Sequence, residues 1–161
     1  MDRERQLREL GESIDHFKNL VGGLPEPLFL KPIHEWSPRD VVAHLIGWNR
    51  HTIEGCMQIL QGEEPFYFGD AENDFSHVNA ESIQRYSSAS KNELIGQMTE
   101  SCRELKAYLL SVDPMHWEMD HGVKYRNWVI TISNTVDALR RDYDVHREQI
   151  EEWLSSSKSQ R

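Results

Sequence analysis

The chain has 161 residues, a length that fits one domain with its own core. Its 18 Lys and Arg residues against 27 Asp and Glu residues give a net charge of −9, which disfavours binding to a nucleic-acid backbone. Apolar residues make up 38% of the chain, and five Trp, five Tyr and five Phe are spread along it, so the composition indicates a folded protein.

Two long helices are predicted in the first 62 residues. Over about residues 2–21, apolar side chains recur at steps of three and four, which is typical of one face of an amphipathic helix. The pair Gly22–Gly23 ends this helix. Ser37 is a suitable N-cap and Pro38 a suitable first helical residue, so a second helix is predicted over about residues 38–62.

The second half of the chain predicts three more helices. A shorter and less regular pattern covers about residues 74–86. Ser90 and Glu93 have the spacing of a capping box, which predicts a long helix from there to the break at Asp113–Pro114. A last long helix is predicted over about residues 128–154.

These elements predict an all-α fold in a single domain, residues 1–154, followed by a frayed tail at residues 155–161. We find no alternation typical of a strand. No apolar run approaches the length of a membrane span, and the first residues have no secretory signal, so we expect a cytoplasmic protein without a membrane partner. Cys56 and Cys102 lie in helical patterns without metal-binding spacing, which favours inert, reduced thiols.

Three polar residues stand where a simple bundle would place apolar ones. His44 lies between Val41 and Trp48 at helical steps, so it should face the core. Asp142 and His146 are four residues apart on the last helix, which lets both side chains reach one ion. Two imidazoles and a carboxylate can bind zinc, nickel, iron or manganese. Spacing alone, however, is more often found for a satisfied core histidine and for a surface Asp–His pair.

Other candidates are weaker. His51 lies two turns after His44 on the same face, where it could substitute for His44, line the same cavity, or simply form the polar end of the apolar stripe, which is the favoured interpretation. His116 and His121 flank a loop and are expected to be solvated, although either could reach the mouth of a pocket. The aromatic residues Phe66–Phe68 and Phe75 could form the wall of an apolar ligand site, and ordinary packing explains them equally well.

Two segments resemble a known family. The segment Trp36–Trp48 has the pattern W-S-x-x-D-V-x-x-H-L-x-x-W, and Asp142–Ile150 has the pattern D-x-x-x-H-x-x-Q-I. Together they are similar to the DinB-like four-helix bundles, and most similar to the ClbS/DfsB group. The resemblance spans most of residues 5–154 and implies a four-helix bundle with long connecting loops.

The resemblance also implies a divalent metal site and a function. His44 and His146 match two of the three histidine ligands of the family, and Asp142 stands in the position of the other histidine. The implied activity is that of a metal-dependent hydrolase or thiol transferase acting on a small electrophilic molecule, with a low-molecular-weight thiol and a homodimer as possible partners. The alternative is a non-catalytic bundle that binds or sequesters a small molecule and has a degenerate metal site.

Overall fold

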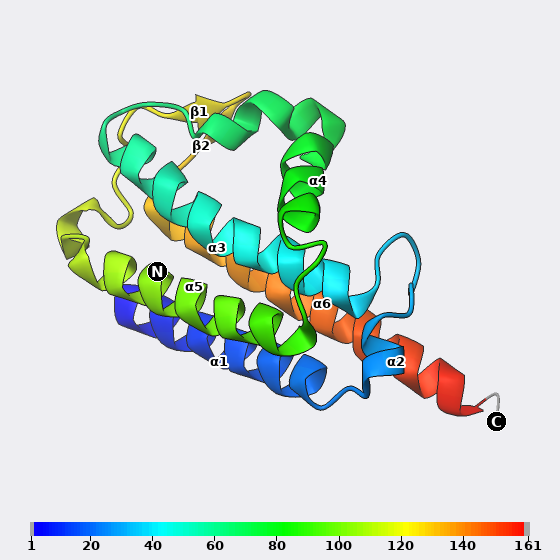
Figure 1. The fold of residues 1–161 in the computed structure, drawn as a ribbon. Helices are drawn as coiled ribbons and strands as arrows, with labels where there is room; N and C mark the ends of the chain where they lie inside the picture. The colour runs from blue at the N-terminus through cyan, green and yellow to red at the C-terminus, as the bar shows by residue number, and fades with distance from the viewer. Residues whose placement is uncertain (1, 160–161) are drawn as a thin grey trace.

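The computed structural model describes residues 2–159 and has the all-α bundle fold that the sequence predicts (Figure 1). The axes of its four long helices run along one another. These helices are α1 (Arg3–Gly22), α3 (Pro38–Leu60), α5 (Lys91–Ser111) and α6 (Ile132–Ser159). The shorter elements are α2 (Glu26–Phe29), the 3-10 helices η1 (Phe66–Asn73) and η2 (Pro114–His116), α4 (Ser76–Arg85), and the strands β1 (Lys124–Tyr125) and β2 (Trp128–Val129). Within residues 2–159 we find no helix with the length and hydrophobicity that a membrane crossing requires.

The connection between α3 and α5 is long because these two helices run in the same direction (Figure 1). The chain must therefore return along the bundle before α5 can begin, as in other bundles with crossover connections. Both η1 and α4 lie in this return, and both pack against α3. The crossover thus places a layer of side chains along one side of α3, from His44 to Gln58.

Local sequence signals explain where the long helices begin. The Ser37 hydroxyl accepts a hydrogen bond from Asp40 N at 3.2 Å, and the Asp40 carboxylate accepts one from Ser37 N at 3.1 Å. Ser90 and Glu93 form the same reciprocal pair at the start of α5. Each pair satisfies two backbone donors that a helix end leaves without partners. Both predicted capping residues are confirmed.

The core lies between the four long helices and contains apolar side chains from each of them. Phe17 of α1 meets Tyr143 of α6 edge to face, with ring centroids 5.6 Å apart. A buried polar network adds specific contacts: Tyr143 donates to Asn49 Oδ1 at 2.7 Å, and Asn49 donates to Ser101 Oγ at 2.9 Å. These bonds join α6, α3 and α5 at one level, so they fix the relative register of the helices.

Several predicted boundaries are wrong. Helix α6 begins at Ile132 rather than Trp128, because residues 124–129 form an antiparallel hairpin that the sequence pattern did not indicate. Each of its strands has two residues, which is too short for an alternation to be visible. At the other end, α6 continues to Ser159, so residues 155–159 are helical rather than a frayed tail, since extending an existing helix adds a hydrogen bond per residue. Residues 160–161 of that predicted tail lie outside the described residues.

Candidate metal centre and its pocket

The two long helices that carry the predicted ligands pack against each other. His44 lies on the face of α3 towards α6, and only 5% of its surface is exposed. Asp142 and His146 lie one turn apart on α6, so their side chains point to the same side of that helix. The apolar faces of α3 and α6 pack against each other, and the three polar side chains lie on these faces. The packing therefore brings them together.

The three side chains form one compact cluster. His44 Nε2 lies 3.0 Å from Asp142 Oδ2, and His146 Nε2 lies 3.1 Å from Asp142 Oδ1. The two imidazole rings meet edge to face with centroids 5.0 Å apart. Each residue offers one ligand atom, and these atoms all lie within 4.8 Å of one another. Over residues 2–159, no other group of three or more His, Cys, Asp or Glu side chains has this geometry.

The carboxylate at the centre of the cluster is ionised at neutral pH. Burial by itself raises the pKa of Asp142, but hydrogen bonds from His146 and His44 outweigh burial and hold that pKa well below its usual range. An ionised carboxylate only accepts hydrogen bonds. Each histidine nitrogen that faces it must therefore carry a proton, or a cation must take the place of that proton between nitrogen and oxygen.

Asn79 on α4 determines which nitrogen of the His44 ring carries the proton. Trp48 Nε1–H donates to Asn79 Oδ1 at 2.7 Å, which identifies this atom as an acceptor because an indole nitrogen is only a donor. His44 Nδ1 lies 3.0 Å from the same oxygen and therefore donates its proton to it. In a neutral His44 the lone pair is then on Nε2 and faces Asp142. Metal-ligating histidines are commonly held in this way by a hydrogen bond to the other ring nitrogen.

These observations fit a divalent cation of the zinc, nickel, iron or manganese type. Ligand atoms about 2.0 to 2.2 Å from one tetrahedral ion lie about 3.3 to 3.6 Å apart. The three candidate ligand atoms lie within 4.8 Å of one another, so small side-chain movements would bring them to that spacing. A lone pair on neutral His44 Nε2 would face the anionic Asp142 oxygen, and either a proton on Nε2 or a cation between the two atoms removes this repulsion. His146 Nδ1 is buried and makes no hydrogen bond, so one imidazole has its orienting partner and the other does not.

Trp36 covers the cluster from the loop before α3. Its ring centroid lies 4.8 Å from that of His44 and 6.1 Å from that of His146. The indole therefore packs on both imidazoles and reduces the access of water to them. The sequence motif contains Trp36, but its position across both rings follows only from the path of the loop.

A pocket of about 900 Å³ opens beside the cluster, and His44, Asp142 and His146 form part of its wall. This volume is within the range of small-molecule sites. The crossover and the hairpin supply the facing walls, including Phe68 of η1 and Trp128 of β2. Of the aromatic residues predicted for such a wall, Tyr67, Phe68 and Phe75 line the pocket and Phe66 does not. These rings also pack on one another and on α3, as in the contact of Tyr67 with Trp48 at 5.0 Å between centroids.

The backbone before α4 is strained where it borders the pocket. Asp74 and Phe75 have φ angles of 54° and 60°, in the left-handed region that costs about 1 to 2 kcal/mol per residue. The Asp70 carboxylate accepts hydrogen bonds from the backbone N–H groups of His77 and Val78 at 2.8 and 3.1 Å, which supports the start of α4. This turn directs the Phe75 ring towards Trp48, with centroids 5.2 Å apart.

The remaining candidate residues lie outside the cluster. His51 does not substitute for His44: its ring packs on Trp48 and Phe66, and burial, Arg85 and His44 lower its pKa to about 4. His116 and His121 are half-buried and face each other, with Nδ1 of the first 3.0 Å from Nε2 of the second. Neither of these two lines the pocket.

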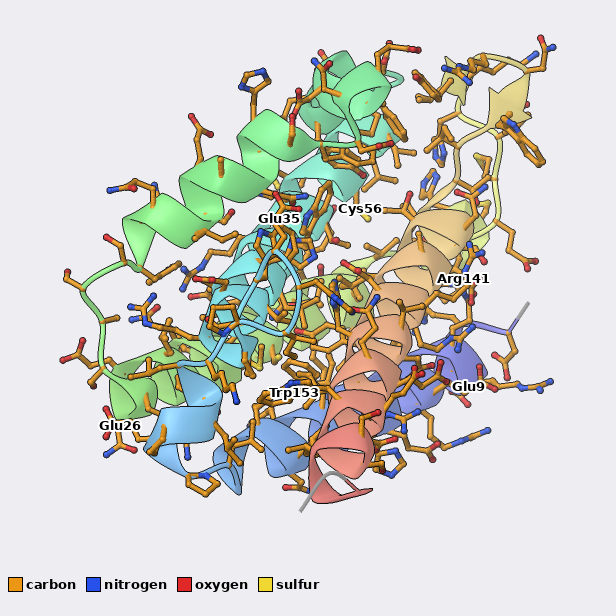
Figure 2. All side chains as sticks on the ribbon, turned by 90° about the vertical axis from the view of Figure 1, so that its right-hand side faces the viewer. Glu9, Glu26, Glu35, Cys56, Arg141 and Trp153 are labelled. Atoms are coloured by element: carbon orange, nitrogen blue, oxygen red, sulfur yellow. The ribbon has the colours of Figure 1, made fainter. Side chains whose placement is uncertain are left out.

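The two cysteines have the environment of inert thiols. Cys56 is fully buried between the helices, and burial raises its pKa to about 12 (Figure 2). Burial also raises the pKa of Cys102, whose sulfur lies 3.3 Å from Asn49 Nδ2 in the buried polar network. A protonated thiol is a poor nucleophile, so neither side chain serves as one at neutral pH.

Comparisons with known proteins support the fold alone. No protein-family model matches this chain, and no curated protein matches it. Among solved structures, a crystal structure of a Streptococcus pneumoniae protein from the Northeast Structural Genomics Consortium is similar, with a TM-score of 0.78. The match covers 96% of this chain and 91% of that chain at 15% sequence identity.

Proposed function

We propose that this protein is a metal-dependent enzyme that hydrolyses a small electrophilic molecule or transfers a low-molecular-weight thiol to it. The observation that carries this proposal is the convergence of His44, Asp142 and His146 in the wall of a pocket. Pockets that combine apolar walls with a few convergent titratable groups are the usual location of active sites.

In this proposal each residue of the site has a separate role. His44 Nε2, the Asp142 carboxylate and His146 Nε2 would hold the ion, and Asn79 would keep His44 in the required tautomer. A divalent ion supplies Lewis acidity, which lowers the pKa of a water or thiol ligand towards neutrality. Trp36 and the apolar pocket walls exclude bulk water, which strengthens electrostatic interactions at the reacting atoms.

One observation favours a second function, a non-catalytic bundle that binds a small molecule. Asp142 is within hydrogen-bond distance of both histidines, so the three side chains can satisfy one another with protons alone. A protein with this arrangement can bind a ligand in the pocket without any ion. The two functions differ in whether an ion is needed for turnover.

The deciding experiment measures turnover of an epoxide, styrene oxide, by protein stripped with a chelator and then reloaded with zinc, nickel, iron or manganese. Each reaction is run with water alone and with added cysteine as the thiol. We expect turnover only after reloading, and none in a His146→Ala variant treated in the same way. Tight binding of styrene oxide without turnover under every condition would favour the non-catalytic bundle.

A further inference from the structure

Several polar side chains in the pocket wall are already used to hold the wall together. Asn134 accepts a hydrogen bond from Thr131 N at 2.9 Å and donates one to Val129 O at 2.8 Å. Thr135 donates to Thr131 O at 2.7 Å. With the Asn79 oxygen shared by Trp48 and His44, these groups are committed to the protein. Among the lining side chains, the triad of His44, Asp142 and His146 is the convergent cluster that remains to recognise a polar group, with the Thr52 hydroxyl and the Asp74 carboxylate as single polar groups beside it.

The charges at the pocket do not suit an anionic ligand. Arg141 is the one Arg or Lys among the described lining residues, and its guanidinium pairs with Asp137 at 3.2 Å. Its side chain is 64% exposed and lies on the outer side of α6 (Figure 2). Asp74 and Asp142 line the same pocket, and the whole chain has a net charge of −9. In the absence of a metal ion, a phosphate or sulfonate would enter this pocket without a free Arg or Lys side chain to pair with.

The wall also presents apolar surface that the protein itself leaves uncovered. Trp128 on the hairpin is 75% exposed, and Val145 on α6 is 49% exposed, although both line the pocket. Deeper in the pocket, the rings of Trp48, Phe75 and Tyr67 meet edge to face. Exposed apolar groups that border one cavity are typical of surface that a ligand covers.

We propose that the pocket binds a neutral, predominantly apolar small molecule with a flat ring or alkyl body, whose single polar end lies at the triad. The body lies against the aromatic residues of η1 and α4 and is covered by Trp128. The assignment of the polar end rests on the proposed function, whereas the assignment of the apolar body rests on the pocket wall alone. The two parts can therefore fail separately.

Two fluorescent dyes with the same ring system test the apolar body in metal-stripped protein. N-phenyl-1-naphthylamine is neutral, and 1-anilinonaphthalene-8-sulfonate carries a sulfonate on the same skeleton. We expect the neutral dye to bind at least tenfold more tightly, as measured by fluorescence titration. Equal affinities, or tighter binding of the sulfonate, would overturn the proposal.

Variants at Ala138, an exposed residue that lines the pocket, show whether the dye occupies this site. Ala138→Trp fills the pocket and should weaken binding of the neutral dye at least tenfold. Ala138→Arg adds a cation and should narrow the preference for the neutral dye over the sulfonate. Ala107, an exposed alanine on α5 away from the pocket, provides matched Trp and Arg controls that should change neither result. Equal dye binding by Ala138→Trp and Ala107→Trp would place the dye elsewhere and contradict the proposal.

The polar end is tested by displacement of the neutral dye from zinc-loaded protein. Octanohydroxamic and acetohydroxamic acids have the same metal-binding group, and each buried methylene should add about fourfold in affinity. We expect displacement at a concentration at least a hundredfold lower for the longer acid. If the parent binds no zinc but still binds the dye in the pocket, the proposed enzyme fails and the ligand class stands. If zinc binds but the longer acid has no advantage, the proposed ligand class fails.

Discussion

In the proposed function, Asp142 is the residue at which protons and a cation would compete for the same oxygens. Without an ion, its two oxygens lie 3.0 Å from His44 Nε2 and 3.1 Å from His146 Nε2, and a hydrogen bond to each requires a proton on that nitrogen. A divalent ion held by these residues would bind the lone pairs of both imidazoles and displace the protons that lie there. Binding of the ion should therefore release protons and weaken as the pH falls, as for other sites with imidazole ligands.

Substitution of the two α6 ligands should have opposite effects on zinc affinity. His146→Ala removes a ligand and should lower the affinity at least tenfold, whereas Asp142→His should retain or increase it because imidazole is a good ligand for borderline divalent ions. Competition with a chromophoric chelator measures both. Weaker binding by Asp142→His would show that the carboxylate is the better ligand here, and unchanged binding by both variants would place the ion elsewhere.

Asn79 should act on zinc affinity through His44. Asn79→Leu removes the acceptor of His44 Nδ1–H and should weaken zinc binding about 10- to 100-fold, as is typical when an orienting partner is lost. Asn79→Asp keeps an acceptor oxygen and should bind zinc at least as tightly as the parent. Nitrogen-15 chemical shifts of the His44 ring should report an Nδ1–H tautomer in the parent and Asp variant only. Parent-like zinc affinity in the Leu variant would exclude this role.

His51 should make the protein less stable below neutral pH. Its pKa is lowered from 6.5 to about 4 by burial, Arg85 and His44, so between these values the unfolded chain binds a proton that the folded chain does not. Stability is then fully present above pH 6.5 and falls as the pH drops towards 4. From pH 7 to pH 5 this effect is about 2 kcal/mol. Urea unfolding at pH 7 and pH 5 should show that the His51→Gln variant loses less free energy of unfolding than the parent by about this amount. An equal loss in both proteins would contradict the assignment of this pH dependence to His51.

The relation between helices α3 and α4 is set by a close approach at Gly47. A Cβ atom at this position would lie 2.1 Å from Ser82 Oγ and 2.8 Å from Ser82 Cβ. Only a glycine lets α4 approach α3 this closely, and α4 carries Asn79 to His44. The missing side chain on α3 is therefore part of what positions the candidate metal ligand.

Matched glycine substitutions test this packing. Gly47→Ala should destabilise the protein by about 1 to 3 kcal/mol because the added methyl overpacks the contact with α4. Gly96 lies inside α5 with nothing within 4 Å of an added Cβ, so Gly96→Ala should stabilise the protein by up to about 1 kcal/mol through helix propensity. Urea unfolding curves of both variants give these free energies. Stabilisation by both substitutions would show that α4 can move away without cost.

The features of this fold that were predicted from the sequence are those that depend on local sequence pattern. The capping residues Ser37 and Ser90 marked helix starts, and the triad followed from the apolar faces of two helices and from a family resemblance. The sequence did not indicate Asn79, because its contact with His44 spans 35 positions and depends on how the crossover folds. It also missed the hairpin, where Arg126 adopts a φ of 55° that residues other than Gly rarely adopt.

Zinc should stabilise the whole fold, since the proposed site joins α3 to α6 and α4 holds its first ligand in place. An ion that binds only the folded chain adds about 2.7 kcal/mol at a free concentration of 100 times its Kd. For a chain of this length that corresponds to a rise in Tm of about 5 to 10 °C. Thermal unfolding of chelator-stripped protein, with and without zinc, nickel and manganese, measures the shift, and His146→Ala is the control that should lose it. If none of the three ions changes the Tm of the parent, the triad is a set of polar residues that satisfy one another with protons. That result would favour the non-catalytic bundle.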